Sequence, residues 1–252
     1  MAGRLGRLAF WAAVLLLWQW TAMRGAPDFV LPPLEIAKQF IAALATRELY
    51  ADAAASLMRA LPGFAVGVAL GIVLGLAAGI ARTFDEMLSP LVFLTYPVPK
   101  IVMLPVFMLW FGIGDLSKVM IIALACFYPA FINAYYGARA TPRILVWSAR
   151  NMGASEAEVF RRVVLPGALP QIFAGLRVAL ALSFIVMFAA EMINARSGLG
   201  HLILVSNGSL DTAEVFAAMT VLSAMAIVLF ALVGLAERRL AWWGRGERRR
   251  MA

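Results

Sequence analysis

The sequence has little from which a catalytic centre could be built. It contains one cysteine, Cys126, and one histidine, His201, among 252 residues. A single cysteine excludes an internal disulfide and a cysteine cluster for a metal, and a single histidine excludes a histidine pair. The two residues also lie far apart in different segments, which makes an intramembrane enzyme improbable. We therefore expect no metal site and no catalytic residues.

Charged residues are also scarce. They make up 14% of the chain, whereas 63% is hydrophobic, and the mean hydropathy is +0.87. A soluble domain of this length could not bury so much apolar surface and still cover itself with polar groups, so lipid is the expected solvent. The first apolar run, residues 8–23, contains Trp11, Trp18 and Trp20. These aromatic residues favour a retained first span over a cleavable signal peptide.

Six apolar segments approach the roughly 20 residues that a helix needs to cross the hydrocarbon core. They run approximately over residues 8–23, 60–80, 90–111, 116–136, 170–193 and 212–235. We therefore expect an all-α membrane protein with about six transmembrane helices and both termini on the same side. Residues 34–58 are expected to form a periplasmic or interfacial helix before the second span.

The net charge of +8 could suggest nucleic acid binding, but the positions of the charges favour another explanation. If both termini are cytoplasmic, most basic residues fall in inner segments. The outer segments then hold only Arg24, Lys38, Arg47, Arg59, Lys118 and Arg196. This bias follows the positive-inside rule. The charge therefore indicates topology, and the arginine-rich end of the chain suits contact with anionic lipid.

The second apolar segment carries glycine at every fourth residue. These residues are Gly63, Gly67, Gly71, Gly75 and Gly79. At that spacing they form one stripe along a helix, where another backbone can approach closely. The stripe predicts a helix-packing seam.

The third segment is rich in proline and contains Lys100. Pro97 and Pro99 free backbone carbonyls, which in a membrane must face protein or a water-filled cavity. A charge in the same segment is costly unless it is paired or wet. Two interpretations stay open: the broken segment lines a translocation pathway, or Lys100 is a structural cation paired with a carbonyl or with Glu191. Glu191 itself could gate the exit of solute, or cap a helix and reach water.

The loop at residues 137–169 is polar and long enough for two short helices. The first is expected from about Pro142 to Met152, ended by Gly153 in the left-handed conformation. Ser155 and Glu158 form the pattern of a capping box that starts the second. Pro166 is expected to stop this second helix, and Pro170 to open the fifth span. An amphipathic helix pair of this kind favours docking to a partner over a plain connecting loop.

The run SARNMGASEAEVFRRVVLPGALPQIFAGLRVAL, which begins at Ser148, resembles the cytoplasmic loop of ABC importer permeases. In that loop a glycine follows an alanine-rich helix, and a Leu-Pro pair comes about a dozen residues later. Residues 95–118 and 190–204 are similar to signatures of the nitrate/sulfonate/taurine branch. Together these matches cover roughly residues 56–235. One departure is that the family's Glu-Ala-Ala triplet is Trp147-Ser148-Ala149 here, so the acidic residue is missing.

The resemblance implies a type I ABC importer permease fold and a set of coupling residues. The residues it assigns to contact with the ATPase are Arg150, Gly153, Ala154, Ser155, Glu158, Phe160, Arg161, Arg162, Leu165 and Pro166. The implied partners are a second permease copy, two ATP-binding cassette subunits and a periplasmic or lipid-anchored binding protein. This chain has no P-loop, so ATP and magnesium are expected on the partner subunit.

These observations divide the chain into three regions and leave one rival function. Residues 1–55 are expected to form the N-terminal span and the periplasmic helix, 56–235 the permease core, and 236–252 a basic cytoplasmic tail. The expected location is the bacterial inner membrane. The solute remains open among sulfonates, taurine, nitrate and vitamin precursors. The rival is a secondary transporter driven by an ion gradient, which would explain the spans but not the paired helices of the loop.

Overall fold

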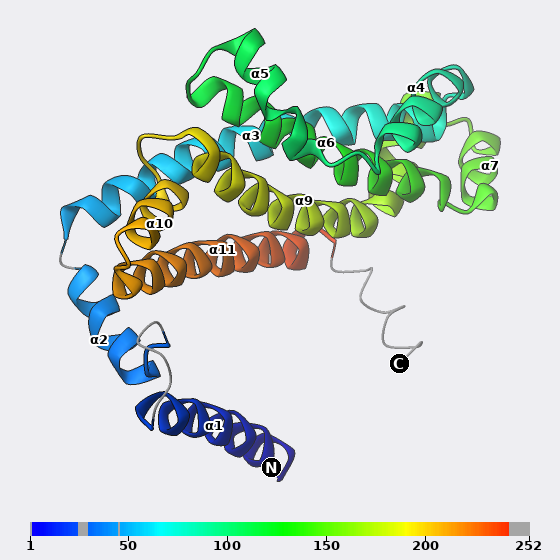
Figure 1. The fold of residues 1–252 in the computed structure, drawn as a ribbon. Coiled ribbons are helices and arrows are strands. Elements are labelled where there is room, and N and C mark those ends of the chain that lie inside the picture. The colour runs from blue at the N-terminus through cyan, green and yellow to red at the C-terminus, as the bar shows by residue number, and fades with distance from the viewer. Residues whose placement is uncertain (1, 25–29, 45, 242–252) are drawn as a thin grey trace.

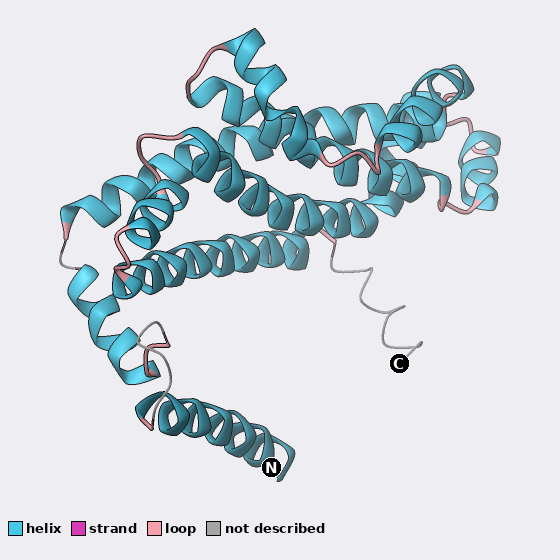
Figure 2. Ribbon diagram, in the orientation of Figure 1, coloured by secondary structure: helices cyan, strands magenta, loops and turns pink. Residues whose placement is uncertain are grey.

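The computed structural model describes residues 2–24, 30–44 and 46–241, and these residues form helices and loops without a strand (Figures 1 and 2). The helices are α1 (Ala2–Met23), α2 (Pro33–Ala43), α3 (Arg47–Ile80), α4 (Arg82–Thr95), η1 (Lys100–Met103), α5 (Leu104–Phe111), α6 (Asp115–Arg139), α7 (Arg143–Asn151), α8 (Glu156–Val159), η2 (Phe160–Val164), α9 (Leu165–Asn194), α10 (Leu199–Gly208) and α11 (Thr212–Leu240).

The centre of the molecule is the row of helices α3, α6 and α9, which pack along one another. The predicted glycine stripe on α3 forms the seam with α6, which confirms that prediction. A Cβ atom built on Gly71 would lie 2.6 Å from the Phe127 carbonyl oxygen, and one on Gly79 would lie 2.8 Å from that of Tyr135. No side chain fits at those distances, so glycine allows the two backbones to meet.

The remaining helices are arranged around this row. Helix α11 runs beside α9 and also contacts α2, while α10 joins the far ends of α9 and α11 (Figure 1). Helix α1 lies away from the bundle in Figure 1 and packs on α2, where Leu34 N donates to Gln19 Oε1 at 3.0 Å. Its aromatic residues Trp11, Trp18 and Trp20 are exposed, as expected for a helix surrounded by lipid.

The helix lengths refine the expected six spans. Among the described residues, four helices are long and apolar enough to cross a membrane: α3, α6, the continuous helix from Glu156 to Asn194, and α11. The proline-rich third segment is a pair of helices bent by 95°, which counts as a fifth if it forms one broken span. The apolar part of α1, Ala9–Met23, is shorter.

Two predicted helix boundaries are wrong. The expected helix over residues 34–58 is interrupted after Ala43, and its second half continues into the second span as one 34-residue helix, α3. Pro166 does not stop a helix, because the chain stays helical from Glu156 to Asn194. The reason is a π-helical stretch, Phe160–Val164, in which Leu165 N donates to the Phe160 carbonyl. This wider turn accommodates Pro166, whose ring would clash with the preceding turn of a regular α-helix.

Candidate functional site

Residues 143–164, which we call the foot, begin with helix α7. Its C-terminal end has the hydrogen bonds of a Schellman motif: Ala154 N donates to the Ala149 carbonyl at 3.1 Å and Gly153 N to the Arg150 carbonyl at 2.9 Å. Gly153 has φ +85°, which confirms the predicted left-handed conformation. A residue with a Cβ atom adopts this conformation at a cost, so glycine sets the turn between the two helices.

The second part of the foot starts with the predicted capping box. Ser155 Oγ accepts from Glu158 N at 3.3 Å, and Glu158 Oε2 accepts from Ser155 N at 3.1 Å. Arg150 donates to Glu156 Oε2 at 2.8 Å and so ties the end of α7 to the start of α8. Glu158 also forms an ion pair with Arg162, in which Oε1 lies 3.5 Å from Arg162 Nη2. Local sequence therefore fixes the geometry of the foot.

The inner face of the foot is packed against the bundle. Ala149, Val159 and Val164 are buried together with residues of α3, α6 and α9, and Phe160 packs beside them. Leu165 is half-buried in the same cluster, and Pro166 is half-buried beside it. Phe160 and Leu165 therefore help to hold the foot to the bundle.

The outer face of the foot is apolar and exposed. Ile144, Leu145, Trp147 and Met152 are between 52% and 81% exposed, and we call these four residues the docking face. The prediction from sequence placed the partner contact from Arg150 onward and did not include Ile144 and Leu145. The sequence did hold a sign of this face, because Ile144 and Leu145 are apolar residues of α7 at positions that do not pack inward. Trp147, which stands where the resemblance expects an acidic residue, lies on this face.

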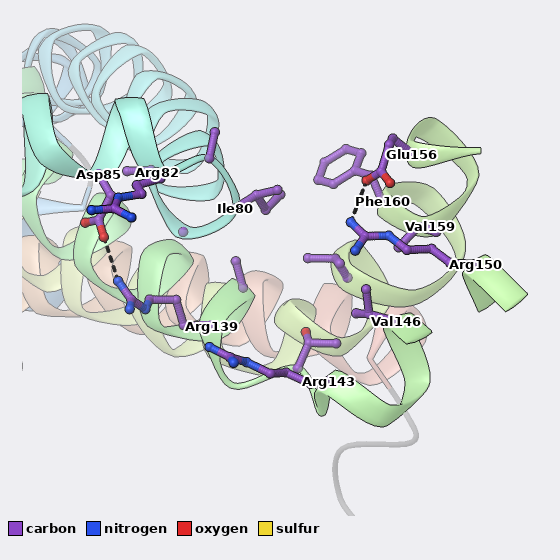
Figure 3. Close-up of a pocket in the computed structure, with 16 residues that line it drawn as sticks. Ile80, Arg82, Asp85, Arg139, Arg143, Val146, Arg150, Glu156, Val159 and Phe160 are labelled. Atoms are coloured by element: carbon purple, nitrogen blue, oxygen red, sulfur yellow. Dashed lines mark hydrogen bonds and ion pairs between the residues drawn. The ribbon is translucent and has the colours of Figure 1, made fainter. Parts of the chain in front are cut away.

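A cleft of about 430 Å³ separates the foot from the ends of α3, α4 and α6 (Figure 3). Arg82, Arg139, Arg143 and Arg150 line it together with Asp85 and Glu156. Arg139 Nη1 lies 2.7 Å from Asp85 Oδ2 and joins α6 to α4. The foot is thus anchored on one side of a basic cleft.

In the broken third segment, backbone carbonyls surround the ammonium group of Lys100, as expected for a structural cation. Lys100 Nζ donates to the carbonyls of Thr95 at 2.7 Å, Tyr96 at 3.0 Å and Val98 at 2.7 Å. It also lies 3.9 Å from the ring centre of Tyr128. Lys100 is therefore a structural cation that binds the carbonyls of the turn, and it does not pair with Glu191.

The same turn lines a half-open cavity of about 330 Å³. Pro97, Pro99 and Lys100 form one wall, and α6 and α9 form the others with mainly apolar side chains, including Ile185. Lys100 therefore has a structural role and also lies in the wall of a cavity. Glu191 is not among the residues that line this cavity.

Glu191 lies in a buried network with Arg59 at the other end of the bundle. The side chain of Glu191 is fully buried, and its Oε1 lies 2.6 Å from Arg59 Nη1. Its Oε2 accepts from Ser56 Oγ at 2.9 Å and from Gly200 N at 2.9 Å. Arg59 Nε also donates to Asp115 Oδ1 at 2.6 Å. Glu191 therefore caps the start of α10 through Gly200 N, but it does not reach water, because it is buried where it links α3 to α9.

Two further polar contacts lie at the two ends of α11. Arg177 pairs with Glu237 and so joins α9 to α11. Asp211 caps α11 by accepting from Glu214 N at 3.0 Å, but the Glu214 carboxylate accepts from Ser206 Oγ at 2.6 Å. The expected basic tail, residues 236–252, starts within α11, which has Arg238 and Arg239 in its last turn and ends at Leu240. Residues 242–252 lie outside the described residues.

Proteins of similar sequence are transport permease proteins. The chain is 39% identical over 232 residues to the riboflavin transport system permease protein RibX of Chloroflexus aurantiacus, covering 91% of this chain and 87% of that protein. It is 34% identical to the taurine transport system permease protein TauC of Escherichia coli, over 92% and 87% of the two chains. The putative aliphatic sulfonates transport permease protein SsuC of Escherichia coli is 37% identical, over 90% and 86%.

Solved structures support the same fold at lower identity. A chain of the inward-facing MetNI methionine ABC transporter superposes with a TM-score of 0.56 at 19% identity, covering 80% of this chain and 96% of that one. A chain of an amino acid ABC transporter crystallised with histidines gives a TM-score of 0.56 at 18% identity, covering 86% and 100%. These matches confirm the expected all-α permease fold.

The family model described as binding-protein-dependent transport system inner membrane component matches residues 55–242. This match covers most of the chain, and the relatives above cover nine-tenths of it, so the assignment does not depend on one motif. A secondary transporter driven by an ion gradient is thereby set aside. The chain belongs to the family of binding-protein-dependent transport system inner membrane components and is the membrane-spanning permease subunit of an ABC importer.

Proposed function

We propose that the docking face on the foot inserts into a groove of an ATP-binding cassette subunit and transmits its closure to the bundle. The observation that carries this proposal is a foot fixed by two local motifs and a packed inner face, whose outer face exposes Ile144, Leu145, Trp147 and Met152. An exposed apolar patch rimmed by polar residues is typical of a protein interface. ATP and magnesium then bind to the partner, and the foot and both termini face the cytoplasm.

Two copies of the chain would pair around the solute pathway, with the cavity beside Lys100 as part of it. Its half-open shape and mainly apolar walls support this role, because a second copy could complete the wall. The solute would be a small organic molecule, with sulfonates first and riboflavin second, delivered by a periplasmic or lipid-anchored binding protein. Lys100 gives no support for an anionic solute, since three carbonyls accept hydrogen bonds from its ammonium group.

The test is reconstitution with the ATP-binding subunit and binding protein encoded beside this chain. Leu145→Glu with Met152→Glu should abolish ATPase stimulation and uptake, because two carboxylates would be buried in an apolar contact. Leu210→Glu is the matched control, since Leu210 is 86% exposed and lies far along the chain from the foot. Uptake without a nucleotide-hydrolysing partner, or full activity of the double variant, would refute the proposal.

A further inference from the structure

The cleft between the foot and the bundle brings together arginines from three separate elements. Arg82 begins α4, Arg139 ends α6 and Arg143 begins α7. All three line the cleft, and Figure 3 shows Arg139 and Arg143 side by side on its lower wall. Residues far apart in the sequence thus place positive charge around one cavity of about 430 Å³.

The positive charge of the cleft is only partly compensated. Asp85 pairs with Arg139 at 2.7 Å, Glu156 pairs with Arg150 at 2.8 Å, and Glu86, which lies outside the cleft, pairs with Arg82 at 2.6 Å. Arg143 makes no ion pair with a described residue. The N-cap of α7 is Pro142, which provides no side-chain hydrogen bond, so the positive end of this helix dipole adds to the charge of Arg143. The cleft therefore suits an anion.

The apolar surroundings indicate which anion. Ile80 ends α3 and lines the cleft while it is 51% exposed. On α4, the exposed side chains Phe84, Met87 and Leu91 extend from the same region along the helix. A surface that passes from exposed apolar side chains to arginines matches the boundary between acyl chains and headgroups.

We infer that this cleft binds the phosphate group of an anionic phospholipid from the inner leaflet, with Arg143 as its principal contact. The inference rests on the proposed function for the side of the membrane on which the foot lies. A lipid held here would contact both the bundle and the foot, and would link the position of the foot to the composition of the membrane.

Binding is measured on the full chain in neutral detergent, with bound lipid counted by native mass spectrometry. Phosphatidylglycerol should bind more tightly than phosphatidylcholine. Arg143→Gln should weaken the binding of phosphatidylglycerol by about fivefold, because one arginine near an anionic surface contributes about 1 kcal/mol. Arg143→Lys keeps the charge and should stay near the wild type. Arg161→Gln is the matched control, because Arg161 is exposed on the foot outside the cleft.

A photoactivatable phosphatidylglycerol gives a second readout that needs no variant. Its cross-links should fall on residues 78–85 and 139–146. Equal binding of the two lipids, an unchanged Arg143→Gln variant, or cross-links elsewhere would overturn the inference. Displacement by inorganic phosphate alone would indicate a free-anion site, and loss of the lipid on assembly with the ATPase would indicate an acidic side chain of that subunit; each overturns the lipid assignment. ATP-driven uptake, measured separately, tests the proposed function whatever these outcomes are.

Discussion

Gly153 determines the angle between the two helices of the foot through its backbone alone. It has φ +85°, and a Cβ atom built there would meet nothing within 4 Å. The requirement for glycine is therefore conformational and does not arise from crowding. A side chain in the left-handed region costs ~1–2 kcal/mol, and asparagine tolerates that region better than other residues.

Gly153→Val should therefore abolish uptake while the protein still inserts into the membrane. The strain would be relieved by rotating residues next to Gly153, which would displace the capping box of Ser155 and Glu158. Gly153→Asn is the control and should retain most of the transport. Uptake assays on membranes with matched protein levels measure both, and normal uptake by the valine variant would remove the proposed role of this turn.

The buried pair of Arg59 and Glu191 supports a prediction about stability. The side chain of Arg59 is 5% exposed and that of Glu191 is 0% exposed. Glu191→Leu leaves the buried Arg59 with only Asp115, which is 68% exposed, as its counter-ion. Breaking a buried pair from one side typically costs ~3–5 kcal/mol. We expect this variant to have a much lower melting temperature in detergent.

The double variant Arg59→Met with Glu191→Leu distinguishes an ion pair from simple packing. It should recover part of the loss, because neither partner is left charged and unpaired. Arg82→Gln is a surface control, since the Arg82 side chain is 91% exposed in its pair with Glu86. If both single and double variants melt like the wild type, the network does not hold α3 to α9.

At the scale of elements, the break between α4 and η1 explains why a lysine lies in an apolar segment. Pro97 and Pro99 interrupt the helix, and three carbonyls at the end of α4 and within the break accept hydrogen bonds from Lys100. Unsatisfied carbonyls at membrane depth are costly, so the ammonium group stabilises the bend of 95°.

Lys100→Met should lower uptake and melting temperature together, because the turn loses a donor to all three carbonyls. Lys100→Arg tests the reason: the planar guanidinium keeps the charge but does not match the geometry of one ammonium group among three carbonyls. We expect it to remain impaired. Full rescue by arginine would instead favour attraction of an anionic solute. Lys38→Met, at a side chain that is 65% exposed, is the control.

At the scale of the whole molecule, labelling can measure directly on which side of the membrane each end of the helix bundle lies. Cys126 is buried, so replacing it with alanine gives a background without cysteine. In that background, Met152→Cys should react with an impermeant maleimide only from the cytoplasm, and Leu210→Cys only from outside. Both side chains are more than 80% exposed. Labelling of Met152→Cys from outside would reverse the proposed orientation.

Local sequence determined the features that depend on neighbours along the chain. The Schellman turn at Gly153 and the capping box at Ser155 use residues within a few positions, so their spacing was sufficient. The glycine stripe predicted close helix packing for the same reason, since a fixed helical period places every fourth residue on one face. Hydrophobic segments predicted the helical membrane fold.

Tertiary structure alone decided the rest. The partner of Glu191 is Arg59, which sequence patterning placed among the outer charges, because nothing local indicates that residues 132 positions apart will meet. The continuation of the helix through Pro166 depends on a π-helical turn packed against the bundle, and the docking face and basic cleft arise only when the foot folds back. Sequence by itself specified the helices, their caps and the seam. Burial and long-range pairing, which depend on how those helices pack, specified the contacts that join them.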